Sequence, residues 1–305
     1  MISDLAIEQS FGQSAQRLKE HHGLDMSPTT IRRVTIAIAK LARQVNQLLP
    51  PTLQNLHEKT IVEFDGGMVP LVKAEGQLDR RKARKCLWAE LRVGSTQKVG
   101  SIDWKYVSSF SSVDDVGDQM RMLLERQMGW TPESTLYGIG DGAKWIVEQM
   151  ERIAGSNFVY TIDLFHLCDY FSGAVAAWAT ATGEEVGRLK MLAKEGKIEN
   201  VVEELRERAH LYPDHEGLAS CIKYIDNRPG QFGYNSIAKM GLPIGSGKIE
   251  STNKHLIQKR LKFPGAWWKR ENAENMAELR VLRANGGWEY LWQGDFSSSA
   301  KKRVV

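Results

Sequence analysis

The sequence has few cysteines and no long apolar run. Its three cysteines, Cys86, Cys168 and Cys221, lie far apart and form no CxxC pair, so neither a disulfide framework nor a zinc knuckle is indicated. No apolar run of about 18 residues occurs, and the N-terminus lacks a basic start followed by an apolar core, so we expect no membrane span and no secretory leader. These absences predict a soluble protein of a reducing cytoplasm.

The charge balance is only mildly basic. The chain has 305 residues with 41 Lys and Arg against 37 Asp and Glu, a net charge of +4, and a pI near 8.8. Hydrophobic residues make up 42% of the sequence, which is ordinary globular composition with length for one large or two medium domains. An anionic partner is therefore permitted, and the distribution of charge must decide it.

The N-terminal segment predicts two helices. Apolar residues recur at helical spacing over residues 5–22, and Gly23 follows as a C-cap. Ser27 and Pro28 are typical of an N-cap and first helical position, and the second helix is expected to run to Pro50. The pair resembles a helix-turn-helix, and the alternative is a plain helical hairpin packed on the core. The residues that a recognition helix would present to a major groove are Arg32 and Arg33.

The next segment predicts short strands. We expect three consecutive antiparallel strands over residues 60–65, 68–74 and 85–94, followed by an amphipathic helix over residues 113–128. The stretch EGQLDRRKARK before the third strand is the densest basic run. It is either a solvated hairpin tip or a contact to phosphates, in which case Arg81 and Lys82 bind DNA.

Aspartate followed by glycine ends two apolar strands. TIVEFDGGMVP contains Asp65, and GIGDGAKWI contains Asp141. Taken alone, Asp-Gly favours a hairpin turn, and we expect Gly66-Gly67 to turn the chain into the next strand. A carboxylate at the tip of a buried strand otherwise needs a partner such as a metal ion. Asp65 and Asp141 are therefore either turn residues or metal ligands.

The order of elements is that of an RNase H-like fold: three strands, then helix, strand, helix, strand and helix. In such a sheet the first and fourth strands lie side by side, so Asp65 and Asp141 become neighbours. Two carboxylates brought close raise each other's pKa unless a divalent cation lies between them. Hard oxygen ligands favour Mg²⁺ or Mn²⁺.

A third carboxylate is available in GSGKIESTNKHLIQ. Its glycines permit a tight entry into a helix, and Glu250 falls in the first turns, from which it can point back at the strand ends. Three such carboxylates would hold two ions per active site for phosphodiester transfer. The alternative for Glu250 is a surface glutamate favoured near a helix N-terminus.

Five segments resemble the DDE transposases of bacterial insertion sequences, specifically the ISKra type: EFDGGMVPL, GDGAKWI, DLFHLCDYF, PIGSGKIESTNKHLIQKRLKFPGAWW and LRVLRANGGWEYLW. The resemblance implies a catalytic DD(E) triad of Asp65, Asp141 and Glu250, with a helical insertion before the glutamate. Asp163 and His166 match a motif that several such superfamilies carry after the second aspartate. His166 would then orient a carboxylate or contact the scissile phosphate, or it is a buried histidine at a strand-helix junction.

Polar and basic residues follow Glu250 along the same helix. Lys254, Lys259 and Arg260 are placed to hold the transposon end by its phosphates. Trp267 and Trp268 either stack on a displaced base or belong to the core, and the core is favoured.

The resulting hypothesis is a metal-dependent DNA transposase that cleaves and joins strands at terminal inverted repeats and target DNA, as a homodimer in the bacterial nucleoid. The alternatives are a metal-dependent nuclease without strand transfer and a catalytically decayed DNA-binding regulator. The expected domains are a helix-turn-helix-like segment (1–50), the first part of an RNase H-like core (51–171), an all-α insertion (172–243), the rest of the core with the Glu250 helix (244–292) and a flexible tail (293–305).

Overall fold

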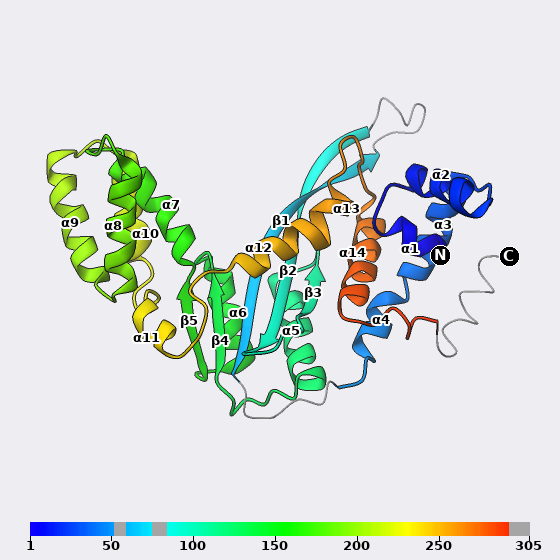
Figure 1. The fold of residues 1–305 in the computed structure, drawn as a ribbon, viewed down its shortest axis with the longest axis horizontal. Helices are drawn as coiled ribbons and strands as arrows, with labels where there is room; N and C mark the ends of the chain where they lie inside the picture. Colours follow the sequence, from blue (N-terminus) through cyan, green and yellow to red (C-terminus); the bar gives the residue numbers. More distant parts are fainter. Residues whose placement is uncertain (52–58, 75–83, 293–305) are drawn as a thin grey trace. The chain divides into compact units, whose positions relative to one another are not determined.

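The computed structural model describes residues 1–51, 59–74 and 84–292 (Figure 1). The chain divides into two compact units. Unit 1 comprises Met1–Glu58, Phe64–Ser134 and Lys248–Val305, and unit 2 comprises Lys59–Glu63 and Thr135–Gly247. In the described ranges, no helix combines the length and apolar character needed to cross a membrane.

The N-terminal part of unit 1 contains four helices rather than the two predicted. They are α1 (Ile2–Ala6), α2 (Phe11–His22), α3 (Pro28–Ala39) and α4 (Ala42–Gln47). The single helix expected over residues 5–22 is wrong because Ser10 interrupts it. Ser10 and Gln13 form a capping box, in which each side chain accepts a hydrogen bond of 3.1 Å from the other's backbone N–H, and this begins a new helix.

The predicted helix caps are confirmed. Gly23 ends α2 with φ of 65°, and Ser27 caps α3 with Pro28 at its first position. Helix α3 ends at Ala39, earlier than predicted, and α4 follows it. A small core of Ala6, Leu18 and Ile31 joins the first three helices. The segment thus packs as a helical cluster, and its contact with DNA stays a prediction.

Strand β1 is one continuous strand, Thr60–Ala74. The turn expected at Gly66-Gly67 is therefore wrong, and so is the division into two strands. The glycines are needed for space. A Cβ on Gly66 would lie 2.3 Å from Glu90 Oε1, and one on Gly67 would lie 2.6 Å from Asn253 Oδ1. Neither glycine has a positive φ, so the chain stays extended through the pair.

Five strands form one mixed sheet in the order β3-β2-β1-β4-β5. The remaining strands are β2 (Arg84–Lys98), β3 (Lys105–Ser109), β4 (Leu136–Gly140) and β5 (Phe158–Ile162). β2 and β3 are antiparallel, whereas β1–β4 and β4–β5 are parallel. The α/β class and the pairing of the first and fourth strands are confirmed. The first two predicted strands are the single strand β1, the third predicted strand lies in β2, and β3 is an additional strand that was not predicted.

The rest of unit 1 is helical. It contains α5 (Val113–Gln127), α12 (Gly247–Thr252, whose first residue belongs to unit 2), a π-helical segment η1 (Asn253–Gln258), α13 (Lys259–Leu261) and α14 (Arg270–Ala284). α5 lies along β3 and β2, and α14 runs beside α3 and α4 (Figure 1). Apolar residues of α14 are buried with Leu71 of β1 and Trp268 in one large core. This core fixes the helix that carries Glu250 to the central strand.

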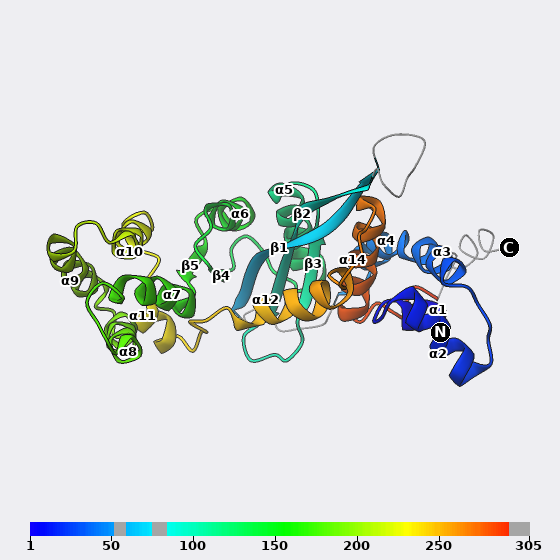
Figure 2. The ribbon, with the colours of Figure 1, turned by 90° about the horizontal axis from the view of Figure 1, so that it is seen from above.

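Unit 2 combines two strands with a helical bundle (Figure 2). After β4 comes α6 (Lys144–Ala154), and after β5 come α7 (Leu164–Val175), α8 (Thr182–Lys194), α9 (Ile198–Leu211), α10 (Glu216–Asp226) and α11 (Tyr234–Lys239). α7 and α10 cross closely, since a Cβ on Gly217 would lie 2.3 Å from the carbonyl oxygen of Gly173. The described residues 172–243 contain no strand, in agreement with the all-helical reading of this stretch.

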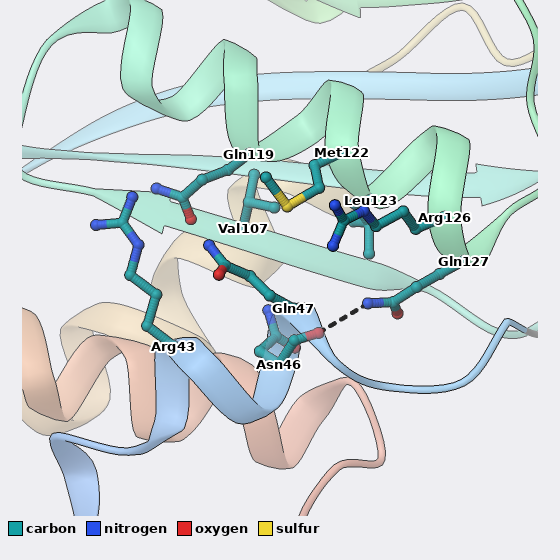
Figure 3. Close-up of a pocket in the computed structure, with 9 residues that line it drawn as sticks. All are labelled: Arg43, Asn46, Gln47, Val107, Gln119, Met122, Leu123, Arg126 and Gln127. Atoms are coloured by element: carbon teal, nitrogen blue, oxygen red, sulfur yellow. Dashed lines mark hydrogen bonds between the residues drawn. The ribbon is translucent and has the colours of Figure 1, made fainter.

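A small polar cavity lies between α4 and α5 in unit 1 (Figure 3). Its volume of about 20 Å³ suits a single water molecule and no larger ligand. Gln127 Nε2 donates a hydrogen bond of 2.9 Å to the carbonyl of Asn46 across it, and Arg43 at its rim pairs with Asp115 at 2.8 Å. The cavity is part of the joint between the N-terminal helices and the sheet.

Candidate functional site

Asp141 opens the turn between β4 and α6 in unit 2. It is exposed, and its Oδ1 accepts a hydrogen bond of 2.8 Å from the backbone N–H of Ala143. Gly142, the next residue, has φ of 80°, a conformation that favours glycine. The second predicted aspartate therefore lies directly after its strand with its carboxylate accessible.

Three side chains form hydrogen bonds with backbone atoms of this turn. Tyr224 Oη donates to the carbonyl of Asp141 at 2.6 Å, Arg228 Nε donates to the carbonyl of Gly142 at 2.9 Å, and Tyr160 Oη accepts from the Gly142 N–H at 3.2 Å. A Cβ on Gly142 would lie 2.6 Å from Arg228 Nε. No local pattern in the sequence connects these side chains with Asp141, because Tyr224 lies on α10 and Arg228 lies two residues after the end of that helix.

The phenols of both tyrosines remain protonated over the physiological pH range. Burial is the main cause that raises the pKa of both Tyr160 and Tyr224 above the ordinary value of 10.0, because burial disfavours the charged phenolate. Arg228 lies over the Tyr224 ring at 4.0 Å, a cation–π contact. The turn that carries Asp141 is therefore held by neutral phenols and one cation.

Asp163 has a structural role at the end of β5. Its Oδ1 accepts from the N–H groups of Phe165 at 2.6 Å and His166 at 3.3 Å, which caps α7. Its Oδ2 accepts from the N–H of Ser246 at 2.7 Å and from the Ser246 hydroxyl. One buried carboxylate thus joins α7 to the glycine-rich turn that leads to Glu250.

His166 lies in an aromatic cluster next to the Asp141 turn. Its ring meets the rings of Tyr170 and Tyr224 edge-on, at centroid distances of 5.6 and 5.9 Å, and Tyr170 and Tyr224 stack at 3.8 Å. His166 is thus one ring removed from the carbonyl of Asp141. A contact with substrate remains a prediction.

Asp65 lies within β1 in unit 1. Its Oδ1 accepts a hydrogen bond of 2.7 Å from the N–H of Gly66, and its Oδ2 accepts one of 2.8 Å from Asn253 Nδ2. Asn253 is only 4% exposed. The polar residues after Glu250 are visible in the sequence, but no local pattern there predicts a contact between Asn253 and Asp65.

Glu250 lies one helical turn before Asn253, so the contact of Asn253 with Asp65 brings the first turn of α12 to the first aspartate. The Glu250 side chain is 67% exposed and forms an ion pair of 2.5 Å with Lys254. An exposed ion pair of this type contributes little stability. Both side chains can therefore exchange partners without loss of the fold.

The two aspartates follow the last paired residues of two parallel strands. Glu63 of β1 is paired with Ile139 of β4, and Asp65 and Asp141 each come two residues later in the chain. The order of the sheet agrees with the predicted pairing of the first and fourth strands, and the proximity of the two carboxylates stays a prediction. Within the described ranges, no three His, Cys, Asp or Glu side chains group as ligands for a metal ion.

Arg280, a buried arginine on α14, connects the helix of Glu250 to the end of α1. Arg280 donates to the carbonyls of Leu256 at 2.5 Å and His255 at 2.7 Å, and also to that of Ile7. His255 and Leu256 belong to the π-helical segment, whose i to i+5 pattern departs from the α-helical ladder. Arg280 thus binds backbone oxygens of η1 and of the N-terminal segment at once.

Arg260 is buried, so the predicted contact of its guanidinium with DNA phosphates does not fit this structure. It is 2% exposed, donates to the carbonyl of Ala6 at 2.8 Å, and lies against the rings of Phe11 and Trp268 at 4.7 and 4.8 Å. Burial, together with the nearby charge of Arg280, lowers its pKa to about 10. A guanidinium enclosed by aromatic rings has no access to a phosphate.

The other predicted DNA contacts fall into three groups. Arg32 and Arg33 are exposed on the first turns of α3. Lys254 and Lys259 are exposed too, and pair with Glu250 at 2.5 Å and with Glu8 at 3.2 Å. Arg81 and Lys82 lie outside the described residues.

The tryptophan pair is divided. Trp268 is 7% exposed and joins the large core, as predicted, and its backbone N–H donates to the carbonyl of Pro70 in β1 at 3.1 Å. Trp267 is 47% exposed, so its assignment to the core is wrong. Adjacent residues in extended backbone point to opposite faces, and only one face here is covered.

Residues 1–292 match the protein-family model described as "Uncharacterised protein family (UPF0236)". The chain belongs to the UPF0236 family. Two UPF0236 proteins of Caldanaerobacter subterraneus subsp. tengcongensis are 32% and 31% identical to it over 153 residues. Each match covers 50% of this chain and 32% or 31% of the relative, so the chain matches about a third of the length of these UPF0236 relatives.

Among solved structures, this UPF0236 chain is similar to the Drosophila P element transposase strand transfer complex. The TM-score is 0.37 and the sequence identity is 10%, over 99% of this chain and 82% of that chain. A similarity of this size gives no information about residue roles. The function of the chain is therefore argued from its own residues.

Proposed function

We propose that the protein is a DDE-type DNA transposase with an RNase H-like core, which cleaves DNA at the ends of an insertion sequence and joins them to target DNA. The observation that carries the proposal is the matching position of Asp65 and Asp141, two residues beyond the paired Glu63 and Ile139 in parallel strands. Glu250 supplies a third carboxylate from the helix that contacts Asp65 through Asn253. Three carboxylates in this strand order suit phosphodiester chemistry.

The residues are compatible with Mg²⁺ or Mn²⁺. Their donor set consists of carboxylate oxygens alone, the ligands that hard divalent cations prefer. Asp65 is held by N–H donors at both of its oxygens, and a carboxylate offers about four lone-pair sites in all. Asp65, Asp141 and Glu250 would hold the two ions, which when bound activate a water or a 3′-hydroxyl and stabilise the leaving oxygen. The chain itself contributes the placement of these carboxylates.

The protein's own side chains supply the placement and the DNA contacts. Tyr224 and Arg228 fix the Asp141 turn, and Asn253 and Gly66 fix the Asp65 carboxylate. Arg32 and Arg33, exposed near the start of α3, are proposed to bind the element's terminal inverted repeats. Lys254 and Lys259 are proposed to bind phosphates of the same DNA once their exposed carboxylate partners release them.

The test uses purified protein and labelled duplexes that carry the inverted repeats flanking its coding region, with Mg²⁺ and a separate target plasmid. Asp65→Ala, Asp141→Ala and Glu250→Ala should each abolish cleavage and joining while DNA binding and thermal stability stay close to those of the unsubstituted protein. Asp214→Ala, a change at an exposed position on unit 2, is the matched control and should keep full activity.

The outcomes separate the rival functions. Cleavage of the repeats without joined products would identify a nuclease, and specific binding without cleavage would identify a DNA-binding regulator. Magnesium-dependent cleavage retained by the Asp141→Ala protein would remove the assignment of the site. A homodimer on DNA, expected for a protein that brings two element ends together, is tested by the mass of the protein–DNA complex. Nucleoid association is tested by imaging a fluorescent fusion in bacteria.

A further inference from the structure

We propose that Asn253 is a positioning residue that holds the Asp65 carboxylate and sets the place of the Glu250 helix against it. The inference rests on the proposed function and names a residue that the DDE assignment does not include. It concerns unit 1 alone, where Asp65, Gly67, Glu250 and Asn253 all lie.

The amide of Asn253 has one orientation that suits its surroundings. Nδ2 donates to Asp65 Oδ2 at 2.8 Å, whereas the reversed amide would place its oxygen against the carboxylate, and two acceptors repel. In this orientation Oδ1 is buried and has no hydrogen-bond partner among the described residues. A buried acceptor without a partner is destabilising. An apolar side chain would fill the same space without that penalty, so stability alone does not explain an asparagine here.

The two glycines after Asp65 serve the same contact. The N–H of Gly66 binds the other oxygen of Asp65 at 2.7 Å. Gly67 provides space, because a Cβ there would lie 2.6 Å from Asn253 Oδ1 and 2.9 Å from its Nδ2. Both oxygens of Asp65 are thus fixed by N–H donors, one from its own strand and one from the Glu250 helix. The extended backbone at Gly66 and Gly67 thus supplies one N–H donor to Asp65 and the space that the Asn253 amide occupies.

This arrangement defines what Asn253 does. A carboxylate bound at both oxygens has lost its side-chain rotation before a cation arrives, so the cation does not have to restrain it. Groups that orient metal ligands in this way typically change metal affinity by about 10- to 100-fold when they are replaced. Because Asn253 also lies one turn after Glu250, its loss frees the first carboxylate and removes the hydrogen bond between it and the helix of the third.

The test measures Mn²⁺ binding directly, by electron paramagnetic resonance of the free ion, and the Mn²⁺ concentration that gives half-maximal cleavage. Asn253→Ala should weaken Mn²⁺ binding about tenfold and raise the half-maximal concentration by the same factor. Saturating Mn²⁺ should restore most of the cleavage rate. Asn272→Ala, the same substitution on α14 in unit 1, should change neither quantity.

A second variant tests the contact with Asn253 present. Gly67→Ala should displace the amide by steric contact and reproduce the weaker Mn²⁺ binding. In the double variant, Gly67→Ala should add little to Asn253→Ala, because the atoms that it would collide with are gone. This non-additivity is the signature of a direct contact. Full additivity, or unchanged Mn²⁺ binding in folded Asn253→Ala protein, would overturn the proposal.

Failure of this inference is distinguishable from failure of the proposed function. If Asp65→Ala and Glu250→Ala bind Mn²⁺ and cleave DNA as the unsubstituted protein does, the triad itself is wrong. If those two variants lose Mn²⁺ binding and cleavage while Asn253→Ala keeps both at the original Mn²⁺ concentration, the triad stands and only the role of Asn253 falls. If Asn253→Ala does not fold, Mn²⁺ binding by the Gly67→Ala protein decides the role of Asn253: unchanged binding would overturn it.

Discussion

The phenol of Tyr224 donates a hydrogen bond of 2.6 Å to the backbone carbonyl of Asp141. The two residues are 83 positions apart in sequence, and the bond joins helix α10 to the turn after β4. Together with Arg228, it makes the helical bundle of unit 2 a support for the proposed second aspartate. The bundle is therefore expected to matter for catalysis even where it does not touch DNA.

Replacement of Tyr224 by Phe removes that bond and keeps the ring. Because the Asp141 turn then loses one of its restraints, we expect cleavage to slow about tenfold. The free energy of unfolding should fall by only about 1 kcal/mol, the usual net contribution of one hydrogen bond. Single-turnover cleavage and urea unfolding measure the two effects. Tyr170→Phe is the control, since that ring stacks on Tyr224 at 3.8 Å. Equal slowing in both variants would argue against a specific role of the Tyr224 hydroxyl.

Substitution of Asp163 should lower the free energy of unfolding much more than substitution of Asp141. Asp163→Ala removes the cap of α7 and the anchor of Ser246, so we expect a loss of about 2–4 kcal/mol in the free energy of unfolding. Asp141→Ala should lose less than about 1 kcal/mol, because its carboxylate is exposed. Thermal denaturation of both variants provides the measurement. A stable Asp163→Ala protein without activity would instead indicate that Asp163 belongs to the catalytic site.

Stability should fall as the pH rises because of Glu278 on α14. Burial raises the pKa of Glu278 from 4.5 to about 8 and outweighs the attraction of Arg43, whose guanidinium lies 4.0 Å away and hydrogen-bonds to Asp115. The folded protein then keeps a proton that the unfolded chain loses above pH 4.5. The stabilisation is complete below the unfolded pKa and is lost as the pH rises towards about 8.

Glu278→Gln removes this titration with little change of shape. At pH 9 the variant should be more stable than the unsubstituted protein by about 2–5 kcal/mol, and near pH 4.5 the two should differ by less than about 1 kcal/mol. Urea unfolding at several pH values provides the measurement. Glu125→Gln, at an exposed ion pair with Arg121, is the control and should show the pH dependence of the original chain. Identical pH profiles for all three proteins would mean that Glu278 ionises normally.

Arg280 and Arg283 allow a comparison between a buried and an exposed arginine on one helix. Arg280→Met leaves the carbonyls of Leu256, His255 and Ile7 without their donor, and we expect a loss of about 3–5 kcal/mol. Arg283→Met removes an exposed ion pair with Asp4 and should cost less than about 1 kcal/mol. Thermal unfolding distinguishes them, and similar small losses would show that η1 does not depend on Arg280.

Local sequence signals predicted the parts of the fold that depend on local chemistry. Ser27 and Pro28 begin α3 and Gly23 ends α2, because capping is decided within a few residues. Short apolar runs located β4 and β5, and the element order predicted that β1 and β4 pair. That the carboxylates of Asp65 and Asp141 lie together stays a prediction from that order.

The errors arose where distant residues decide the structure. Gly66 and Gly67 were assigned to a turn because Asp-Gly is typical of one, whereas they remain extended to leave room for Glu90 and Asn253. Arg260 was placed on a DNA-binding face because it follows other basic residues, yet the carbonyl that holds it belongs to Ala6, 254 positions earlier. Neither partner is visible in a window of neighbouring residues.

The π-helical segment Asn253–Gln258 has a consequence for sequence comparison within the UPF0236 family. A π-turn accommodates one residue more than an α-turn, so the helix after η1 is out of phase with the helix before it by about one residue, or about 100°. A relative that lacks the extra residue would keep the residues equivalent to Glu250 and Asn253 in place. Its equivalent of Arg260 would be rotated away from the rings of Phe11 and Trp268. Alignments of the family should therefore admit a one-residue gap between Asn253 and Gln258. Members with the gap would have a regular α-helix there, and members without it would have the π-helical segment.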